Sequence, residues 1–437
     1  MSIAKELDRG IAKVAPKRET LISLILVVLF AAQTFQDSIA QSQAFHLSVV
    51  EIVSVLCLAI WILETGRLDL PRSRSGKLVF YLLGCWALLG LGLWVVSGDW
   101  AYNLNEVTWL WISLGAVIIL SYAAEYKWER TIEIFVGITF LSALVADVQG
   151  LTGVFAPPFA SPPAKEFFLA PTSFGAQTLA VGFYRHPNAF GAQVFWPLLI
   201  CLGLAFKKKY RLLAILGVAF FGASLYLSYY RTLLVGFLFA GVLFAMVQIR
   251  VRPWIFASAA GVMSAAGMIG SVALALLAKG EVFLGDLNGR AVYWRDAFRL
   301  IQAQPVILLL GSGFHPSGEL MQAQARADPH NVYVYMLMHY GVVGLILLVL
   351  LIGTIVAVGW RGYRSGKLNR EPVLGAIWVG FIAWFVTGTV DSRLTTAEWQ
   401  VLFVTVVFLF LGGLFSQAER GEVPASDQRL ARIPEDV

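Results

Sequence analysis

Residues 332–358 read VYVYMLMHYGVVGLILLVLLIGTIVAV, a run without a single charged side chain. An α-helix needs about 20 predominantly apolar residues to cross the hydrocarbon core of a bilayer, so this run predicts a membrane-spanning helix. Eleven further apolar runs lie near residues 21–37, 46–63, 78–97, 105–124, 131–151, 188–206, 212–229, 232–248, 254–278, 373–390 and 400–415. The sequence therefore predicts an all-α, polytopic transmembrane helical bundle of about 12 spans.

The composition of the whole chain favours the same class. Of the 437 residues, 58% are hydrophobic and only 14% are charged, whereas a soluble domain carries roughly a quarter charged residues. The net charge of +6 comes from basic residues scattered over short loops, so membrane lipids are expected as partners and nucleic acid is not. Cys57, Cys85 and Cys201 lie inside apolar runs without metal-ligand spacing, so we expect small core residues there.

The distribution of lysine and arginine predicts the orientation. If both termini are cytoplasmic, most of the 33 basic residues fall on cytoplasmic segments, as the positive-inside rule requires. In this scheme residues 1–437 form one integral membrane domain. It has two long outer loops, 152–187 and 279–331, and a cytoplasmic tail, 416–437. The first loop contains Pro157, Pro158, Pro162, Pro163 and Pro171, so it cannot form one continuous helix.

The same charge argument divides the apolar region 212–248. The basic clusters 207–211 and 250–252 both have the character of cytoplasmic loops, so an even number of crossings lies between them. This places Arg231, within the sequence SYYRT of residues 228–232, at the outer apex of a tight hairpin.

Two other outer segments carry arginines near predicted helix ends. Arg185 precedes Pro187, which fixes a turn before the sixth span. Residues 288–304 predict an amphipathic helix at the membrane surface, and Arg290 shares its buried stripe with Trp294. Ionisable residues at membrane depth are costly and are functional candidates by default. Guanidinium groups pair bidentately with phosphate, so Arg185, Arg231 and Arg290 in one cavity would suit a diphosphate; the alternative is chance dispersal of loop arginines.

Polar residues also gather directly before the run that opens this section. The sequence Asp328-Pro329-His330-Asn331 predicts Asp328 as the N-cap and Pro329 as the first helical residue. His330 and Asn331 would then lie in the first turn. The positive end of the helix dipole disfavours a protonated imidazole, which would keep His330 neutral and able to accept a proton. Upstream, the glycine-rich stretch 311–318 predicts either a simple turn or an anion-binding backbone.

Taken in order, these motifs resemble the bacterial O-antigen ligases and Wzy-type O-antigen polymerases. The resemblance covers roughly residues 180–360. It rests on the hairpin Ser228–Arg231, on Gly289-Arg290 with Trp294, on Pro305 with Gly311 and Gly313, and on His330-Asn331 followed by Gly341-Val342-Val343-Gly344.

The resemblance implies a GT-C-like bundle in the bacterial inner membrane, whose outer loop carries short amphipathic helices. Such proteins transfer a glycan from undecaprenyl diphosphate to an acceptor hydroxyl on the periplasmic face, without a metal or other cofactor. It implies His330 as general base and Arg185, Arg231 and Arg290 as diphosphate binders, with Asn331 also contacting substrate. The acceptor would be lipid A–core in a ligase, a second lipid-linked repeat in an O-antigen or exopolysaccharide polymerase, or a protein hydroxyl in a protein O-oligosaccharyltransferase.

The chemistry favours the same reaction. A lipid diphosphate is a good leaving group, so the reaction needs charge stabilisation on the diphosphate and deprotonation of the acceptor. The chain contains no Asp-x-Asp, which argues against a metal-bridged nucleotide-sugar donor, and a single displacement predicts inversion. The alternatives are a transporter or flippase of lipid-linked sugars, which commonly shows related halves that we do not find here, and a non-catalytic scaffold.

Overall fold

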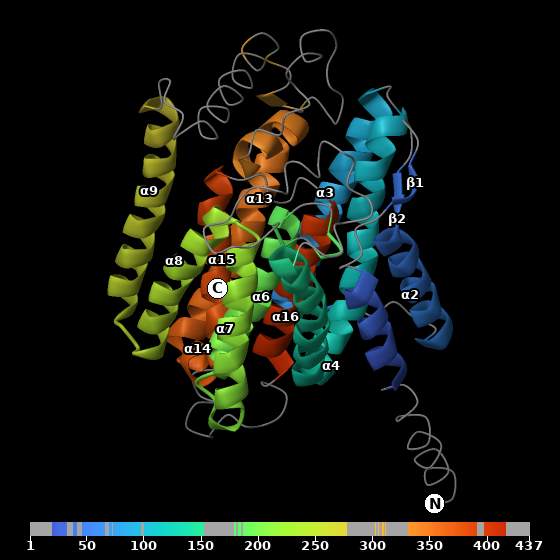
Figure 1. Cartoon of the computed structure of the whole chain (residues 1–437). Coiled ribbons are helices and arrows are strands. Elements are labelled where there is room, and N and C mark those ends of the chain that lie inside the picture. The colour runs from blue at the N-terminus through green and yellow to red at the C-terminus, as the bar shows by residue number, and fades with distance from the viewer. Residues whose placement is uncertain are drawn as a thin grey trace, which may run out of the picture.

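Nearly all of the described chain is helical (Figure 1). The computed structural model describes residues 20–32, 38–41, 46–65, 70–71, 73–97, 100–152, 179–180, 182–184, 187–277, 302, 305, 308–309, 311, 331–390 and 397–416. The helices are Thr20–Ala32, α2 (Val49–Thr65), α3 (Arg74–Ser97), α4 (Trp100–Thr152), α6 (Pro187–Leu204), α7 (Arg211–Leu227), α8 (Arg231–Gln248), α9 (Pro253–Leu277), α13 (Val332–Arg364), α14 (Lys367–Arg370), α15 (Pro372–Thr387) and α16 (Ala397–Ser416). Short 3₁₀ turns, η1 (Lys208–Tyr210) and η3 (Gly388–Val390), precede α7 and follow α15.

These helices confirm an all-α membrane protein, with one exception. Strands β1 (Ser38–Gln41) and β2 (His46–Ser48) pair antiparallel between the first two helices. The predicted span 46–63 is therefore wrong at its first three residues, which lie in β2 before α2 begins at Val49. Hydropathy does not detect this hairpin, because its strands are only four and three residues long.

Within the described residues, six helices are long and apolar enough to cross a membrane. They are Arg74–Leu93, Lys127–Thr152, Pro187–Leu204, Lys208–Leu227, Arg231–Gln248 and Val332–Arg364. Five shorter apolar helices accompany them, Thr20–Ala32, Ile52–Glu64, Pro253–Ala266, Pro372–Thr387 and Leu402–Phe415. Each predicted apolar run thus coincides largely with a helix, while the total of 12 crossings stays a prediction.

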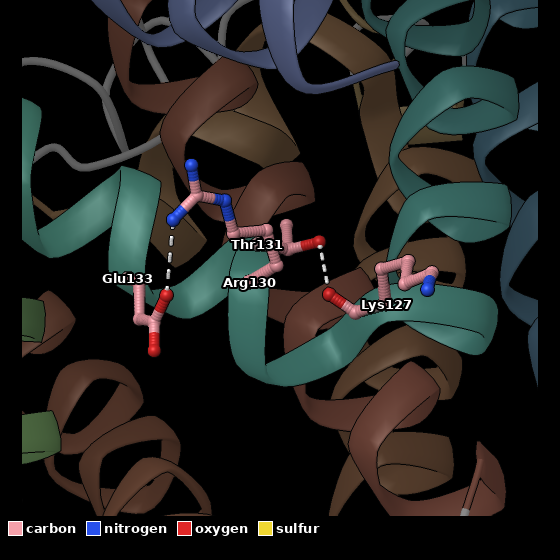
Figure 2. A network of polar contacts seen from close by, with 4 residues as sticks. All are labelled: Lys127, Arg130, Thr131 and Glu133. Atoms are coloured by element: carbon pink, nitrogen blue, oxygen red, sulfur yellow. Dashed lines mark hydrogen bonds and ion pairs between the residues drawn. The ribbon is translucent and has the colours of Figure 1, made fainter. Parts of the chain in front are cut away.

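Two predicted spans, 105–124 and 131–151, both lie in α4, which has 53 residues and consists of two helical halves joined by a kink. Lys127 breaks it with non-helical torsions, φ −138° and ψ 48°. Figure 2 shows how the break is held: the Thr131 hydroxyl donates to the Lys127 carbonyl oxygen at 2.9 Å, and Arg130 pairs with Glu133 at 3.3 Å. The same hydroxyl lies 3.2 Å from Ala123 O, so it contacts carbonyl groups on both sides of the break.

The interior of the bundle is built around α6 and α15. The buried rings of Trp196 and Trp384 lie 5.1 Å apart between their centroids, and Phe381 lies 4.9 Å from Trp196. Lipid tails are as apolar as these side chains, so close packing rather than the hydrophobic effect holds such helices together. Small residues allow the closest approaches: a methyl group added at Gly203 would lie 2.6 Å from Cα of Val373, and one at Gly412 2.3 Å from Cβ of Ala124.

The contacts of α15 define the two ends of the bundle. Gly203, near the end of α6, faces Val373 at the start of α15, and Gly236, near the start of α8, faces Thr387 at the end of α15. α6 and α8 therefore both run antiparallel to α15. We call the end where α6 and α8 begin and α7 and α15 end the site end, and the opposite end the basic end.

The basic end is held by polar contacts between short loops. Lys207 Nζ lies 2.8 Å from Glu371 Oε2, and Arg250 Nε donates to Asn369 Oδ1 at 2.6 Å. The amide of Asn369 also donates to Gln248 O at 2.6 Å, closing the end of α8. Figure 1 shows α14 and the start of α7 together at this end.

The Gly203 contact predicts a stability difference. Gly203→Ala should lower the thermal midpoint of the detergent-solubilised protein, because overpacking against backbone costs about 1–3 kcal/mol. Gly222→Ala is the matched control, since nothing lies within 4 Å of a Cβ there; it should leave the midpoint unchanged or raise it. Equal midpoints for the two variants in fluorescence-detected thermal unfolding would contradict the packing described here.

Candidate active site

The five predicted site residues divide into two groups. Arg185, Arg290 and His330 lie outside the described residues, so their roles stay predictions. Arg231 and Asn331 are described, and each marks the start of a helix, α8 and α13.

Arg231 lies at the apex of the predicted hairpin, which the structure confirms. Helix α7 ends at Leu227 and α8 begins at Arg231, with three residues between them. Tyr229 takes the left-handed conformation at φ +57°, which reverses the chain within this short connection. Its ring stacks on the exposed guanidinium of Arg231, whose carbon lies 4.3 Å from the ring centroid, and its hydroxyl accepts a hydrogen bond from Nη2. No carboxylate of the described chain pairs with Arg231, so its positive charge is uncompensated there.

The hairpin apex is fixed against α6. Ser228 is buried and donates its hydroxyl to Leu225 O at 2.7 Å, so its polar group is satisfied within the turn. Gly191 of α6 lies so close that an added Cβ would come within 2.7 Å of Ser228 Oγ and 3.0 Å of Tyr230. The start of α6, which follows Arg185 in the sequence, therefore lies beside the turn that carries Arg231.

Asn331 corrects the predicted start of the tenth span. Its Oδ1 accepts hydrogen bonds from the backbone N–H groups of Tyr333 and Val334 at 3.0 and 3.1 Å, so Asn331 is the N-cap and α13 begins at Val332. The prediction of Asp328 as N-cap and Pro329 as first helical residue is wrong. An asparagine suits this position because its amide can also donate, and Nδ2 does so to Thr389 O at 2.8 Å. His330 therefore precedes the cap in the sequence, and the prediction that His330 and Asn331 lie in the first turn is wrong.

The end of α15 joins the starts of α8 and α13. A Cβ at Gly388 would lie 3.0 Å from Val332, and one at Gly236 would lie 3.4 Å from Thr387. The Tyr333 hydroxyl adds a bond to Phe385 O at 3.0 Å. Arg231 lies five residues before Gly236, about 7.5 Å along the helix axis. Arg231 and Asn331, a hundred residues apart in the sequence, thus share the site end.

The described part of the outer loop touches α13 at a second point. Gly311, at φ +78°, and Gly341, at φ +65°, meet backbone to backbone. A Cβ on Gly311 would lie 2.3 Å from His339 O, and one on Gly341 would lie 2.3 Å from Leu309 O. The helix breaks at Gly341, nine residues or about 13 Å from its start. Gly311 thus serves as a docking point on α13, while residues 312–318 of the predicted glycine-rich turn lie outside the described residues.

The sequence-based prediction did not consider Asp147, the acidic residue of the predicted span 131–151. It is buried at the site end of α4, and its Oδ2 accepts a hydrogen bond from Ser224 Oγ of α7 at 2.6 Å. An acidic residue inside a predicted span was the available signal. In the described part of the chain, no three His, Cys, Asp or Glu side chains lie close enough to share a metal ion.

The glycine contact predicts a specific defect. Gly341→Ala should lower the thermal midpoint and increase proteolysis of the 279–331 loop, because alanine is strained at this φ and its methyl group would displace the Leu309 backbone. Gly353→Ala, on the same helix with nothing within 4 Å of its Cβ, is the control and should match the wild type. Identical cleavage of all three proteins would rule out loop docking through this contact.

Comparison with known proteins bears on the same segment. Residues 216–349 match the family model described as Wzy_C, O-Antigen ligase, a stretch that runs from α7 into α13 and contains Arg231, Gly311, Asn331 and Gly341. No curated protein gives a significant match to the chain. Over this stretch, which is less than half of the chain, the match confirms the predicted resemblance to the O-antigen ligase and Wzy superfamily.

Proposed function

We propose that this protein transfers glycans from an undecaprenyl-diphosphate-linked donor to an acceptor hydroxyl, with the reaction at the site end of the bundle. The family match over residues 216–349 supports glycan transfer of the O-antigen ligase or polymerase type. One structural observation carries the placement of the site. The end of α15 contacts α8, the helix that begins at Arg231, through Thr387 and Gly236, and it contacts Asn331, the sequence neighbour of His330, through Thr389.

The distribution of charge supports a periplasmic site in the bacterial inner membrane. The described basic residues near loops gather at the end opposite Arg231; they include Lys127, Lys207, Lys208, Lys209, Arg211, Arg250, Arg361, Arg364, Lys367 and Arg370. Cytoplasmic loops are enriched in lysine and arginine. The basic end then faces the cytoplasm, and the site end faces the periplasm, where lipid-linked donors are available and nucleotide sugars are not.

In the proposed reaction, Arg185, Arg231 and Arg290 bind the donor diphosphate through bidentate guanidinium pairs. The acceptor oxygen attacks the anomeric carbon while the bond from that carbon to the diphosphate oxygen breaks. His330 takes the acceptor proton, and the diphosphate departs as an anion on its lipid. This single displacement inverts the anomeric centre and requires no metal. Arginine charge stabilises the leaving group, so no strong general acid is needed.

Asn331 has a defined place in this scheme. Its Oδ1 caps α13 and its Nδ2 holds Thr389, so most of its hydrogen-bonding capacity goes to the protein backbone. We propose that it supports substrate binding chiefly by holding the chain next to His330. This constraint matters because a base contributes only when it lies within hydrogen-bond reach of the proton that it removes.

The proposal predicts distinct effects for two site variants. In nanodiscs with a lipid-linked oligosaccharide donor, His330→Ala should lower the turnover rate about 10²–10⁴-fold, the usual contribution of a positioned base. Arg231→Ala should weaken donor use, with partial recovery in Arg231→Lys, because lysine keeps the charge but not the bidentate fork. Arg211→Ala is the matched control, since Arg211 is also exposed at the first position of a helix but lies at the basic end.

The same assay contains outcomes that contradict the proposal. Product formation by His330→Ala within about threefold of the wild type would remove this residue as base. Loss of activity in EDTA would exclude a metal-free reaction, and NMR of a product with a retained anomeric centre would exclude a single displacement. Parallel reactions with lipid A–core, a second lipid-linked repeat and a serine-containing peptide would identify the acceptor class.

A further inference from the structure

Asp147 is a buried charged residue that the proposed reaction does not use. Among the described residues it is the one charged side chain with less than a tenth of its surface exposed, at 8%. It lies five residues before the end of α4, within the candidate span Lys127–Thr152. A carboxyl group in this setting is costly and persists where it has a specific partner or role.

The partner of Asp147 belongs to the hairpin that carries Arg231. Oδ2 of Asp147 lies 2.6 Å from the hydroxyl of Ser224, which is fully buried. Ser224 lies one helical turn before Ser228 and the apex of the hairpin. No partner for Asp147 Oδ1 exists among the described residues. The bond to Ser224 is a buried polar contact that joins the site end of α4 to the hairpin.

The same turns of α4 hold the segment that leads into Arg185. Gln149 Oε1 accepts a hydrogen bond from Gly182 N at 2.8 Å, and Gly182, at φ +61°, lies against Ala146. Ala180 N donates to Leu227 O at 3.1 Å, which joins this segment directly to the end of α7. One short stretch of α4 thus contacts both arginine-bearing segments.

Tyr184 extends this contact to the residue adjoining Arg185. Its ring is buried, with its centroid 5.8 Å from that of Phe190 in the first turn of α6. Its hydroxyl faces Ser142 of α4, and burial raises the pKa of this phenol above its usual value, so it remains a neutral group. The backbone that enters Arg185 is therefore seated between α4 and α6.

We propose that Asp147 is a positioning residue for the donor: its hydrogen bond to Ser224 fixes the Arg231 hairpin relative to the Arg185 segment. The inference rests on the proposed function, because it assigns these two arginines to one diphosphate. The hydrogen bond, rather than the charge of the carboxylate, is the contact that matters. Loss of this bond would separate the two cations and weaken donor binding. Proton transfer at His330, which adjoins α13, would keep its rate.

The first experiment compares Asp147→Ala, Ser224→Ala and Asp147→Asn in nanodiscs. Both alanine variants should raise the donor KM and the Kd for undecaprenyl diphosphate about tenfold, the scale of one lost hydrogen bond, with kcat within about threefold. Asp147→Asn should stay near the wild type, because its side-chain oxygen can still accept from Ser224. The double alanine variant should have a donor KM and Kd no higher than those of the more impaired single variant, since both substitutions remove the same contact.

Ser121→Ala is the matched control, because Ser121 is also buried in α4 but bonds only to Ile118 O of its own helix, at 3.1 Å. It should leave the donor KM unchanged. The proposal is overturned if Ser224→Ala keeps the wild-type KM and Kd, if the loss falls on kcat alone, or if Asp147→Asn is as impaired as Asp147→Ala. Ser224→Ala carries the test by itself where Asp147→Ala does not fold.

A second measurement is independent of activity. Spin labels at Phe183→Cys and Val235→Cys, both exposed positions, report the distance between the Arg185 segment and the start of α8 in a background without the exposed Cys85. Ser224→Ala should broaden or shift this distance, and Ser121→Ala should not. An unchanged distance overturns the positioning role. If the wild type makes no product while Ser224→Ala shifts the distance, the proposed glycan transfer is wrong. The proposal that the Asp147–Ser224 bond positions the two segments is then supported independently.

Discussion

The rest of the structure depends on the absence of water as a hydrogen-bonding partner inside a bilayer. Each backbone N–H and C=O group must then find a partner within the protein, so helices are the available element, and a break requires a substitute. At Lys127, which lies at the basic end between the two halves of α4, the Thr131 hydroxyl lies within hydrogen-bonding distance of both Lys127 O and Ala123 O. At Gly341 the loop backbone near Leu309 and Gly311 approaches the break directly. Both irregularities in the long helices are thus covered by protein groups.

This constraint also determines where a site can form. Polar groups are least costly at helix ends, and the ends that meet near α15 come from distant parts of the sequence. Asn331 illustrates the result: one amide group caps α13 and holds Thr389, 58 residues away. Arg231 reaches the same end through a tight turn that places Tyr229 over its guanidinium. Between the two ends, aromatic side chains of α6 and α15 pack against each other in the interior of the bundle.

The polar contacts at the two ends of the bundle differ in how deeply they are buried. At the basic end, Lys207 and Glu371 form a partly exposed ion pair, a type of contact that contributes little to stability. At the site end, Asp147 and Ser224 are buried and depend on each other. The buried hydrogen bond defines the relative position of its two helices more narrowly than the partly exposed ion pair does, because a buried polar atom has few alternative partners. The proposed donor site therefore lies beside the more deeply buried of these two polar contacts.

The sequence by itself determined the helices, because hydropathy and charge are local properties. It predicted nearly every apolar helix, the interruption near Lys127 and the hairpin apex at Arg231. The tertiary structure alone decided the features that depend on distant partners. The N-cap of α13 is Asn331 rather than Asp328, and its amide also donates to Thr389 O, 58 residues away. The bond from Asp147 to Ser224 spans 77 residues. The helix break at Gly341 lies at the point where the backbone of Gly311 contacts α13. The pairing of β1 with β2 could not be predicted from hydropathy. Such contacts link segments whose approach is set by the packing of whole helices, which no short stretch of sequence encodes.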